Sequence, residues 1–310
     1  MKTIFGPINS RRFGKSLGVD LSPNTKQCNF DCLYCELKPA KVVDAQNTIL
    51  PIEQIVNDIQ NALKEFKDID VLTITANGEP TLYPHLSELM DAINKIKGTT
   101  KTLILSNAST IAQKEIQKAL LKFDSVKLSL DCATQNCFRK LDRPSKSISL
   151  DAIKEGMLAF KKIYRGELII EILFVEGIND NLKEVAQLNQ FLLKLKPSRI
   201  DIGTIDRPPA YNIKALAYDK LRKLSLAFDA SLPVVITAKA PQKGLQYNYT
   251  TEDLLHTLSR RPLTNADIET LFNKASQERF YKLLNEGKII PEESSGIIFY
   301  RTKESECSNP

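Results

Sequence analysis

Short runs of β-branched and aliphatic residues alternate with longer amphipathic segments from residue 17 to about residue 240. Such alternation over this length predicts a parallel sheet with helices on its outer face, that is, an α/β fold. The expected strands are Leu17–Leu21, Val71–Ala76, Thr102–Ser106, Val126–Leu130, Leu168–Val175, Ile200–Ile205 and Val234–Thr237. The expected helices are Ile52–Phe66, Leu86–Ile96, Ile111–Phe123, Leu150–Ile163, Leu182–Leu195 and Leu216–Phe228.

About six strand–helix units favour a partial barrel of the (β/α)6 type over a closed eightfold barrel. The expected strands carry nearly continuous apolar runs, which is typical of strands buried on both faces. In such folds the loops that follow the strands form the reactive end of the sheet. We therefore expect functional residues directly after the strands.

The pattern changes after about residue 245, which divides the chain into a core domain (1–245), a small domain (246–303) and a flexible tail (304–310). The small domain is expected to be winged-helix-like, with three short helices followed by a β-hairpin. We expect Ser276 to be the N-cap of the third helix. The expected elements are helices Thr251–Ser259, Asn265–Phe272 and Gln277–Glu286, and strands Lys288–Pro291 and Gly296–Arg301.

Composition places the chain among soluble globular proteins, with 42% hydrophobic and 26% charged residues. No apolar run reaches the ~18 residues that a membrane span requires, and the N-terminus lacks the apolar segment of a signal peptide. A cytoplasmic location is therefore expected. There, cysteines act as metal ligands or free thiols more often than as disulfides.

The net charge of +6 is unevenly distributed. Residues 251–303 hold eight cationic and eight acidic residues, and the tail adds Glu304 and Glu306, so residues 1–250 carry about +8. A positive field of this kind favours an anionic substrate or nucleic acid.

Cys28, Cys32 and Cys35 form a C-x3-C-x2-C triplet directly after the first expected strand. Thiolates are the ligands of iron–sulfur clusters, and three close cysteines leave one iron of a 4Fe–4S cluster available to another molecule. The alternatives are a structural zinc site or a chance group of buried cysteines. Zinc normally takes four ligands, and neither His85 nor His256 lies nearby in the sequence.

The triplet, with Tyr34 before its last cysteine, resembles the signature of the radical S-adenosylmethionine (radical SAM) superfamily. The resemblance implies that the amine and carboxylate of S-adenosylmethionine chelate the available iron. It also implies that the reduced cluster cleaves the cofactor to methionine and a 5′-deoxyadenosyl radical, which abstracts hydrogen from a substrate. Tyr34 is then expected to pack against the adenine end of the cofactor.

Asn77-Gly78-Glu79-Pro80-Thr81 follows the second expected strand, at the place of the family's glycine–glutamate motif. The resemblance implies that a backbone edge at Gly78 and the carboxylate of Glu79 receive the cofactor's ammonium group. A plain turn is the alternative interpretation of these residues.

Polar residues end three further strands. Asn107 and Asp131 follow the third and fourth strands, where cofactor, ribose or substrate would lie. Arg207 precedes two prolines after the sixth strand, which leaves its guanidinium available to an anion or a carboxylate. Solvated strand ends and a structural ion pair are the alternatives.

Arg11, Arg12 and Lys15 precede the first expected strand and would contact phosphates of tRNA or of a smaller anion. A solvated basic loop is the alternative. Lys127 we interpret as a charge at a strand edge without a function.

A narrower resemblance covers residues 5–240 and rests on Ser10–Gly18, the triplet Cys28–Cys35, Gly78–Thr81 and Asp206–Pro209. It indicates an uncharacterised Fe–S oxidoreductase subgroup related to the tRNA wybutosine-synthesising enzymes. Cys132, Cys137 and Cys307 are too few for a second cluster, so we expect one cluster and interpret these three as buried or idle thiols.

The leading hypothesis is therefore an enzyme with a 4Fe–4S cluster and S-adenosylmethionine, acting on a tRNA base or a peptide. Reduced ferredoxin or flavodoxin is the implied electron donor. The alternative is a non-catalytic iron–sulfur sensor that binds nucleic acid through residues 246–303. The zero net charge of residues 251–303 counts against that alternative, because DNA affinity depends on neutralising phosphates.

Overall fold

An eight-stranded sheet forms the centre of the chain, in the order β1-β2-β3-β4-β5-β6-β7-β8. The computed structural model describes residues 3–10, 12–236, 246–260, 262–294 and 297–303. All neighbouring strands from β2 to β8 are parallel, whereas β1 runs antiparallel to β2. The strands are β1 (Ile4–Ser10), β2 (Gly14–Asp20), β3 (Val71–Thr75), β4 (Lys101–Ser106), β5 (Ser125–Ser129), β6 (Glu167–Phe174), β7 (Arg199–Thr204) and β8 (Val234–Ile236).

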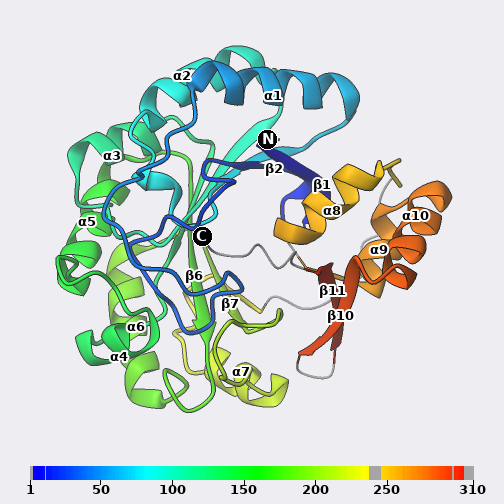
Figure 1. Cartoon of the computed structure of the whole chain (residues 1–310). Coiled ribbons are helices and arrows are strands. Elements are labelled where there is room, and N and C mark those ends of the chain that lie inside the picture. Colours follow the sequence, from blue (N-terminus) through cyan, green and yellow to red (C-terminus); the bar gives the residue numbers. More distant parts are fainter. Residues whose placement is uncertain (1–2, 11, 237–245, 261, 295–296, 304–310) are drawn as a thin grey trace.

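The expectation of a parallel α/β sheet is confirmed, and each of the seven expected strands is present in the described residues; Thr237 at the end of the last one lies outside them. Figure 1 shows the sheet curved into an open barrel with helices along its outer side. The helices of this layer are α1 (Ile52–Glu65), α2 (Leu86–Ile96), α3 (Lys114–Leu120), α4 (Gln135–Leu141), α5 (Leu150–Ile163), α6 (Leu182–Leu195) and α7 (Tyr218–Ser225), with a 3-10 turn, η1 (Pro80–Leu82), after β3. Two of them, α3 and α7, are shorter than expected by two or three residues at each end.

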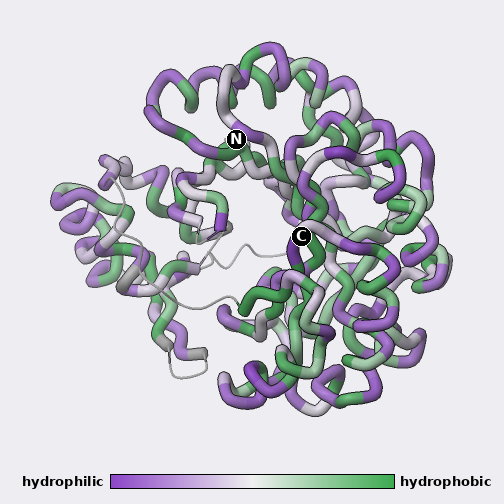
Figure 2. The backbone as a smooth tube through the Cα atoms, turned by 180° about the vertical axis from the view of Figure 1, so that it is seen from behind, coloured by the Kyte–Doolittle hydropathy of each residue, from purple (hydrophilic) through white to green (hydrophobic). Residues whose placement is uncertain are grey.

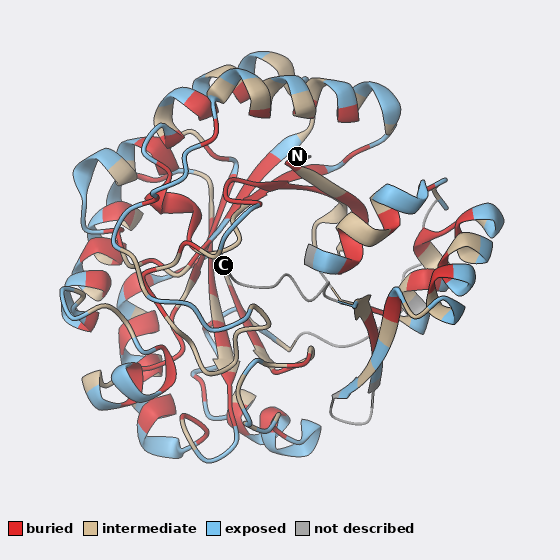
Figure 3. Cartoon of the chain, viewed as in Figure 1, coloured by how far each residue is buried: buried red, intermediate tan, exposed pale blue. Residues whose placement is uncertain are grey.

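The helices bury their inward-facing residues against the sheet and leave charged residues outside. In α1, for example, Ile55 and Ile59 are fully buried, while Glu53 and Lys64 are exposed. Figure 3 shows this division along the whole outer layer, and Figure 2 shows the matching alternation of apolar and polar positions. This burial accounts for most of the large apolar core.

Strand β1 was not expected from the sequence. It forms a hairpin with β2, and the ring of Phe5 lies across Gly18 of the neighbouring strand. A Cβ at Gly18 would lie 2.2 Å from Cζ of Phe5, so the pairing depends on glycine there. The hairpin turn enters the barrel from the end at which the parallel strands begin.

The inner face of the sheet departs from the expected apolar pattern. Lys127 on β5, Glu171 on β6 and Asp201 on β7 meet Arg12 from the hairpin turn. Arg12 lies 3.3 Å from Glu171 and also pairs with Asp201, and Lys127 pairs with Glu171 and lies 3.4 Å from Asp201. Burial opposes ionisation of both carboxyl groups, but the two cations outweigh it and hold their pKa values below the usual range.

This ion cluster corrects two interpretations. Lys127 is not a strand-edge charge, because its side chain is only 6% exposed and faces the barrel interior. Arg12 does not project freely into solvent, because its guanidinium pairs with the carboxylates of Asp201 and Glu171. Arg11 lies outside the described residues.

We expect Asp201→Asn to lower the free energy of unfolding by about 3 kcal/mol, because it deprives Arg12, Lys127 and Arg199 of the buried carboxylate that they share. Urea unfolding measures the loss. Glu115→Gln, which breaks an exposed pair with Lys118, is the control and is expected to cost less than about 0.5 kcal/mol. Equal effects of the two changes would contradict a stabilising role for the ion cluster.

Cys132 and Cys137 were expected to be thiols, but the structure joins them in a disulfide with Cα atoms 5.6 Å apart. Cys132 follows the end of β5, and Cys137 lies in the first turn of α4, which begins after its N-cap Thr134. The sequence interpretation was wrong because five residues along a chain do not reveal whether a turn brings two sulfur atoms together. Cys307 lies outside the described residues.

Reduction of this disulfide is expected to lower the free energy of unfolding by about 2 kcal/mol, the size that chain entropy gives for so short a loop. The measurement is urea unfolding with and without dithiothreitol. The double variant Cys132→Ala/Cys137→Ala should unfold identically in both conditions. A parent protein that is equally insensitive to the reductant would contradict the assignment.

The described residues between 246 and 303 form a further unit around a second apolar cluster, which also includes Ile8 of β1. Its elements are α8 (Thr251–Arg260), β9 (Leu263–Thr264), α9 (Asn265–Leu271), α10 (Lys274–Asn285), β10 (Ile289–Ser294) and β11 (Ile297–Thr302), and its three strands pair antiparallel in the order β10-β11-β9. The unit packs beside β1 (Figure 1), where the hydroxyl of Tyr249 donates to the carbonyl of Pro7 at 2.6 Å.

Helix α10 begins earlier than expected. Its N-cap is Asn273, whose side chain accepts a hydrogen bond from the amide of Ser276. Ser276 is instead fully buried, and its hydroxyl accepts from the amide of Tyr249 at 2.6 Å. Strand β9 was also not expected, because two residues give no periodicity to detect. Among the described helices, none has the length and apolar character needed to cross a membrane.

Candidate functional site

The loop between β2 and α1 carries the three cysteines of the triplet, which we call the cysteine loop (residues 26–36). All three are free and partly buried. The loop leaves β2 at the end of the sheet where the parallel strands finish, as expected for a functional segment. Backbone hydrogen bonds attach it to several other parts of this end of the barrel.

The first attachment is to the end of β3. The amide of Gln27 donates to the carbonyl of Asn77 at 2.8 Å, and the amide of Glu79 donates to the carbonyl of Gln27 at 3.0 Å. Between them Gly78 adopts φ +139°, and a Cβ there would lie 1.9 Å from the carbonyl oxygen of Gln27. Gly78 therefore allows a close approach of the cysteine loop, where the sequence suggested an approach of the cofactor.

The second attachment is to the end of α4. The amide of Leu33 donates to the carbonyl of Leu141 at 2.9 Å, and the ring of Phe30 meets that of Phe138 edge-on at 5.4 Å. The disulfide holds the other end of α4 through Cys137, so it stabilises a helix that contacts the cysteine loop.

The third attachment is to the loop after β7. The amide of Ala210 donates to the carbonyl of Cys35 at 2.8 Å, and Arg207 binds Glu36 with N–O distances of 2.7 and 2.9 Å. The hydroxyl of Tyr211 donates to Asp31 at 2.6 Å. Arg207, expected to serve an anion or a carboxylate, therefore holds the carboxylate next to the last cysteine.

The thiols lie in an environment that disfavours negative charge. Burial raises the pKa of Cys28 to about 12 and also raises the pKa values of Cys32 and Cys35. Lys26 opposes this at Cys35, where its amino group lies 3.5 Å from the sulfur. Three thiolates are stable together here only with a positive partner, and iron ions supply such charge. The donor set therefore suits a cluster with three protein ligands.

Glu79 connects the ends of β3 and β4. Its carboxylate accepts from the hydroxyl of Thr81 at 2.6 Å, the hydroxyl of Ser106 at 2.7 Å and the amide of Asn107 at 2.7 Å. The side-chain amide of Asn107 in turn lies 3.7 Å from the sulfur of Cys28. Burial raises the pKa of Glu79, and these donors act against that rise.

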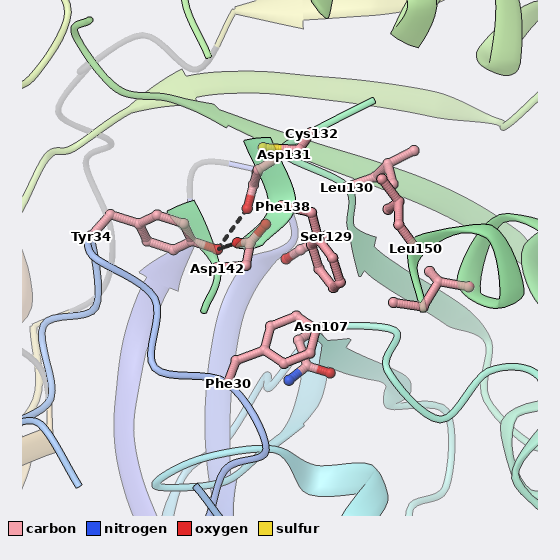
Figure 4. Close-up of a pocket in the computed structure, with 11 residues that line it drawn as sticks. Phe30, Tyr34, Asn107, Ser129, Leu130, Asp131, Cys132, Phe138, Asp142 and Leu150 are labelled. Carbon is pink, nitrogen blue, oxygen red and sulfur yellow. Dashed lines mark hydrogen bonds between the residues drawn. The ribbon is translucent and has the colours of Figure 1, made fainter. Parts of the chain in front are cut away.

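Tyr34 points toward two buried carboxyl groups, those of Asp131 and Asp142 (Figure 4). Its hydroxyl donates to Asp131 at 2.6 Å and lies 3.5 Å from Asp142. Burial raises the pKa of Asp131 to about 7, and burial together with Asp131 raises that of Asp142. Asp131 also accepts from the amide of Leu173 at 2.6 Å, so it joins β5, β6 and the cysteine loop.

A cavity of about 390 Å³ occupies the concave side of the sheet, a volume typical of small-molecule sites. Arg12, Lys127 and Glu171 lie on its wall, as do Glu36 and Arg207 beside the cysteine loop. Asn77 also lines it, and its buried Oδ1 accepts no hydrogen bond within the described part of the chain. An acceptor without a donor at this place is suited to a ligand that carries an ammonium group.

The structure thus brings most of the sequence-predicted residues to one end of the barrel. Hydrogen bonds of Asn107 link Glu79 with Cys28, and Gly78 pairs with Gln27 of the cysteine loop. Cys35 is bonded instead to Lys26 and Ala210, and Arg12 lies at the opposite end of the cavity. Sequence reasoning missed Asn77, Glu36 and Lys127. Asn77 follows a strand and was available as a signal, but nothing in the sequence pairs Glu36 with Arg207.

Comparison with known proteins identifies the family of the chain. Residues 24–188 match the family model described as the radical SAM superfamily. A UPF0026 protein of Helicobacter pylori (strain J99) is 42% identical over 301 residues, covering 96% of this chain and 96% of that protein. A UPF0026 protein of Methanocaldococcus jannaschii is 31% identical over the whole of both chains.

Solved structures share the fold at low sequence identity. TYW1 with a bound lysine–pyruvate adduct has a TM-score of 0.51 and 18% identity, covering 70% of this chain and 74% of that one. Streptococcus suis SuiB bound to its precursor peptide SuiA has a TM-score of 0.56 and 19% identity, covering 71% and 48%. Together with the family match and the relatives, this likeness leads to one conclusion: the chain belongs to the radical SAM superfamily, whose members bind a 4Fe–4S cluster and S-adenosylmethionine.

Proposed function

We propose that this protein is a radical SAM enzyme in which Cys28, Cys32 and Cys35 hold the 4Fe–4S cluster. The single observation that carries the proposal is the position of three free, partly buried cysteines on a loop at the end of a cavity of about 390 Å³. When bound, the reduced cluster and S-adenosylmethionine supply a 5′-deoxyadenosyl radical that abstracts hydrogen from the substrate. The protein holds both groups, orients them and encloses them.

The end of β3 would hold the cofactor's ammonium group. Asn77 offers an unused buried acceptor, and Glu79 offers a carboxylate whose orientation is fixed by Thr81, Ser106 and Asn107. An ammonium group placed there gains charge-assisted hydrogen bonds. Tyr34 would contribute its ring to the adenine end, since its hydroxyl is engaged by Asp131.

The core domain (1–245) would carry the reaction, and the unit 246–303 would be a winged-helix-like domain that presents substrate or contacts another protein. The order of three helices and an antiparallel sheet, β10-β11-β9, supports this assignment. The substrate classes are a tRNA base and a peptide. TYW1 and SuiB, which share the fold, support one class each.

Anaerobic reconstitution with iron and sulfide, followed by S-adenosylmethionine and dithionite, is expected to yield 5′-deoxyadenosine. Cys28→Ala, Cys32→Ala and Cys35→Ala should each abolish it and lower the bound iron, because each removes one cluster ligand. Chromatographic assay of 5′-deoxyadenosine and iron analysis provide the two readouts. A variant that keeps full iron and full turnover would remove that cysteine from the ligand set.

Asn77→Ala and Glu79→Gln are expected to weaken S-adenosylmethionine binding by about tenfold each, the cost of about 1.4 kcal/mol for one lost charge-assisted hydrogen bond. Cluster content should stay unchanged. Equilibrium binding to the reconstituted protein measures the effect, and Asn57→Ala, on the exposed face of α1, is the control. A non-catalytic iron–sulfur sensor would need the cysteines but would tolerate both changes, so unchanged cofactor affinity would favour that function.

A further inference from the structure

Two segments enclose the outer side of the cysteine loop, and we call them the basic rim (residues 38–44 and 139–146). The amide of Val43 donates to the carbonyl of Cys28 at 2.9 Å, and the amide of Ser145 donates to the carbonyl of Asn29 at 2.8 Å. The two segments also meet each other, because the hydroxyl of Ser145 donates to Asp44 at 3.1 Å. The rim is therefore one continuous surface attached directly to the cysteines.

The rim carries a strong excess of positive charge. It has six exposed cations and one exposed acidic residue, Asp44. The cations are Lys38, Lys41, Arg139, Lys140, Arg143 and Lys146. Within the described part of the chain, four of them (Lys41, Arg139, Lys140 and Lys146) take part in no ion pair, whereas Arg143 lies 3.2 Å from Asp31.

The folded chain gives little use for the four cations that take part in no ion pair. Arg139 and Lys140 lie in the last turn of α4, where the helix dipole favours cations, but Lys41 and Lys146 lie in loops. None of the six lines the cavity on the concave side of the sheet. A molecule that binds the rim would thus come close to the cysteines without entering the cavity.

We propose that the basic rim is the docking surface for an acidic one-electron donor protein of the flavodoxin type. The proposal rests on the proposed function, because a reductively driven centre needs such a donor. A partner of opposite charge is steered to this surface and held beside the cysteine loop. A substrate must reach the cavity, so the position of the rim favours an electron donor over RNA.

The test compares two sources of electrons in the reconstituted protein. Formation of 5′-deoxyadenosine is measured with dithionite, and separately with flavodoxin reduced by NADPH and flavodoxin reductase. In the rim variant Lys41→Gln/Arg139→Gln/Lys140→Gln/Lys146→Gln, we expect the flavodoxin-driven rate to fall by about tenfold or more at low salt. The dithionite-driven rate should stay within about twofold, because a small reductant needs no docking surface.

The matched control removes four exposed lysines from the other end of the barrel. Lys64, Lys95, Lys162 and Lys194 lie in the last turns of α1, α2, α5 and α6, which precede the beginnings of the strands. Their change to Gln alters net charge by the same amount and should leave both rates unchanged. Equal flavodoxin-driven losses in the two variants would overturn the proposal, since they would show an effect of net charge alone.

Other outcomes overturn the proposal in distinct ways. An unchanged flavodoxin-driven rate in the rim variant would exclude the rim, and if that variant also lost affinity for unmodified tRNA, the rim would be assigned to RNA. Loss of both the flavodoxin-driven and the dithionite-driven rate would show that these residues are needed for folding or for the reaction itself, and not for docking. Direct titration of flavodoxin onto parent and rim variant tests docking even if dithionite yields no 5′-deoxyadenosine, so failure of the proposed function is recognised separately.

Discussion

The close contact between Gln27 and Gly78 is the constraint on which the site depends. It pairs the cysteine loop with the end of β3 through two backbone hydrogen bonds, and no side chain larger than hydrogen is tolerated at Gly78. The same turn carries Asn77 and Glu79, so the cysteines and the residues proposed for the cofactor are set relative to each other by backbone geometry. Rigid placement of this kind is what a site needs when two bound groups must meet.

Further contacts hold the rest of this long, irregular loop in place. Helix α4 holds its middle through Leu141 and Phe138, and the loop after β7 holds its end through Arg207 and Ala210. A segment without regular structure becomes ordered because its backbone groups find partners on several neighbouring segments. The disulfide between β5 and α4 stabilises the helix that contacts the loop, and the buried carboxyl group of Asp131 binds Tyr34 of the loop directly.

The protein has two groups of charged residues, one inside the barrel and one on its surface, and they serve different purposes. The ion cluster of Arg12, Lys127, Glu171 and Asp201 is neutral as a set and closes the bottom of the cavity, where isolated charges would be costly. Four exposed cations of the basic rim, Lys41, Arg139, Lys140 and Lys146, take part in no ion pair within the described residues and lie beside the cysteine loop. One group stabilises the folded barrel, whereas the other supplies the field that a charged partner would detect.

The sequence by itself determined the alternation of strands and helices, the cysteine triplet and the polar strand ends, because periodicity and spacing are local properties of a chain. It did not reveal β1, the inward direction of Lys127, the pairing of Arg12 with Asp201 or the bond between Cys132 and Cys137. Each of these depends on which segments become neighbours and in what register, and only the tertiary structure decides that. Glu36 and Arg207 are the simplest example. They are 171 residues apart in the chain, yet the guanidinium nitrogen of Arg207 lies 2.7 Å from a carboxylate oxygen of Glu36.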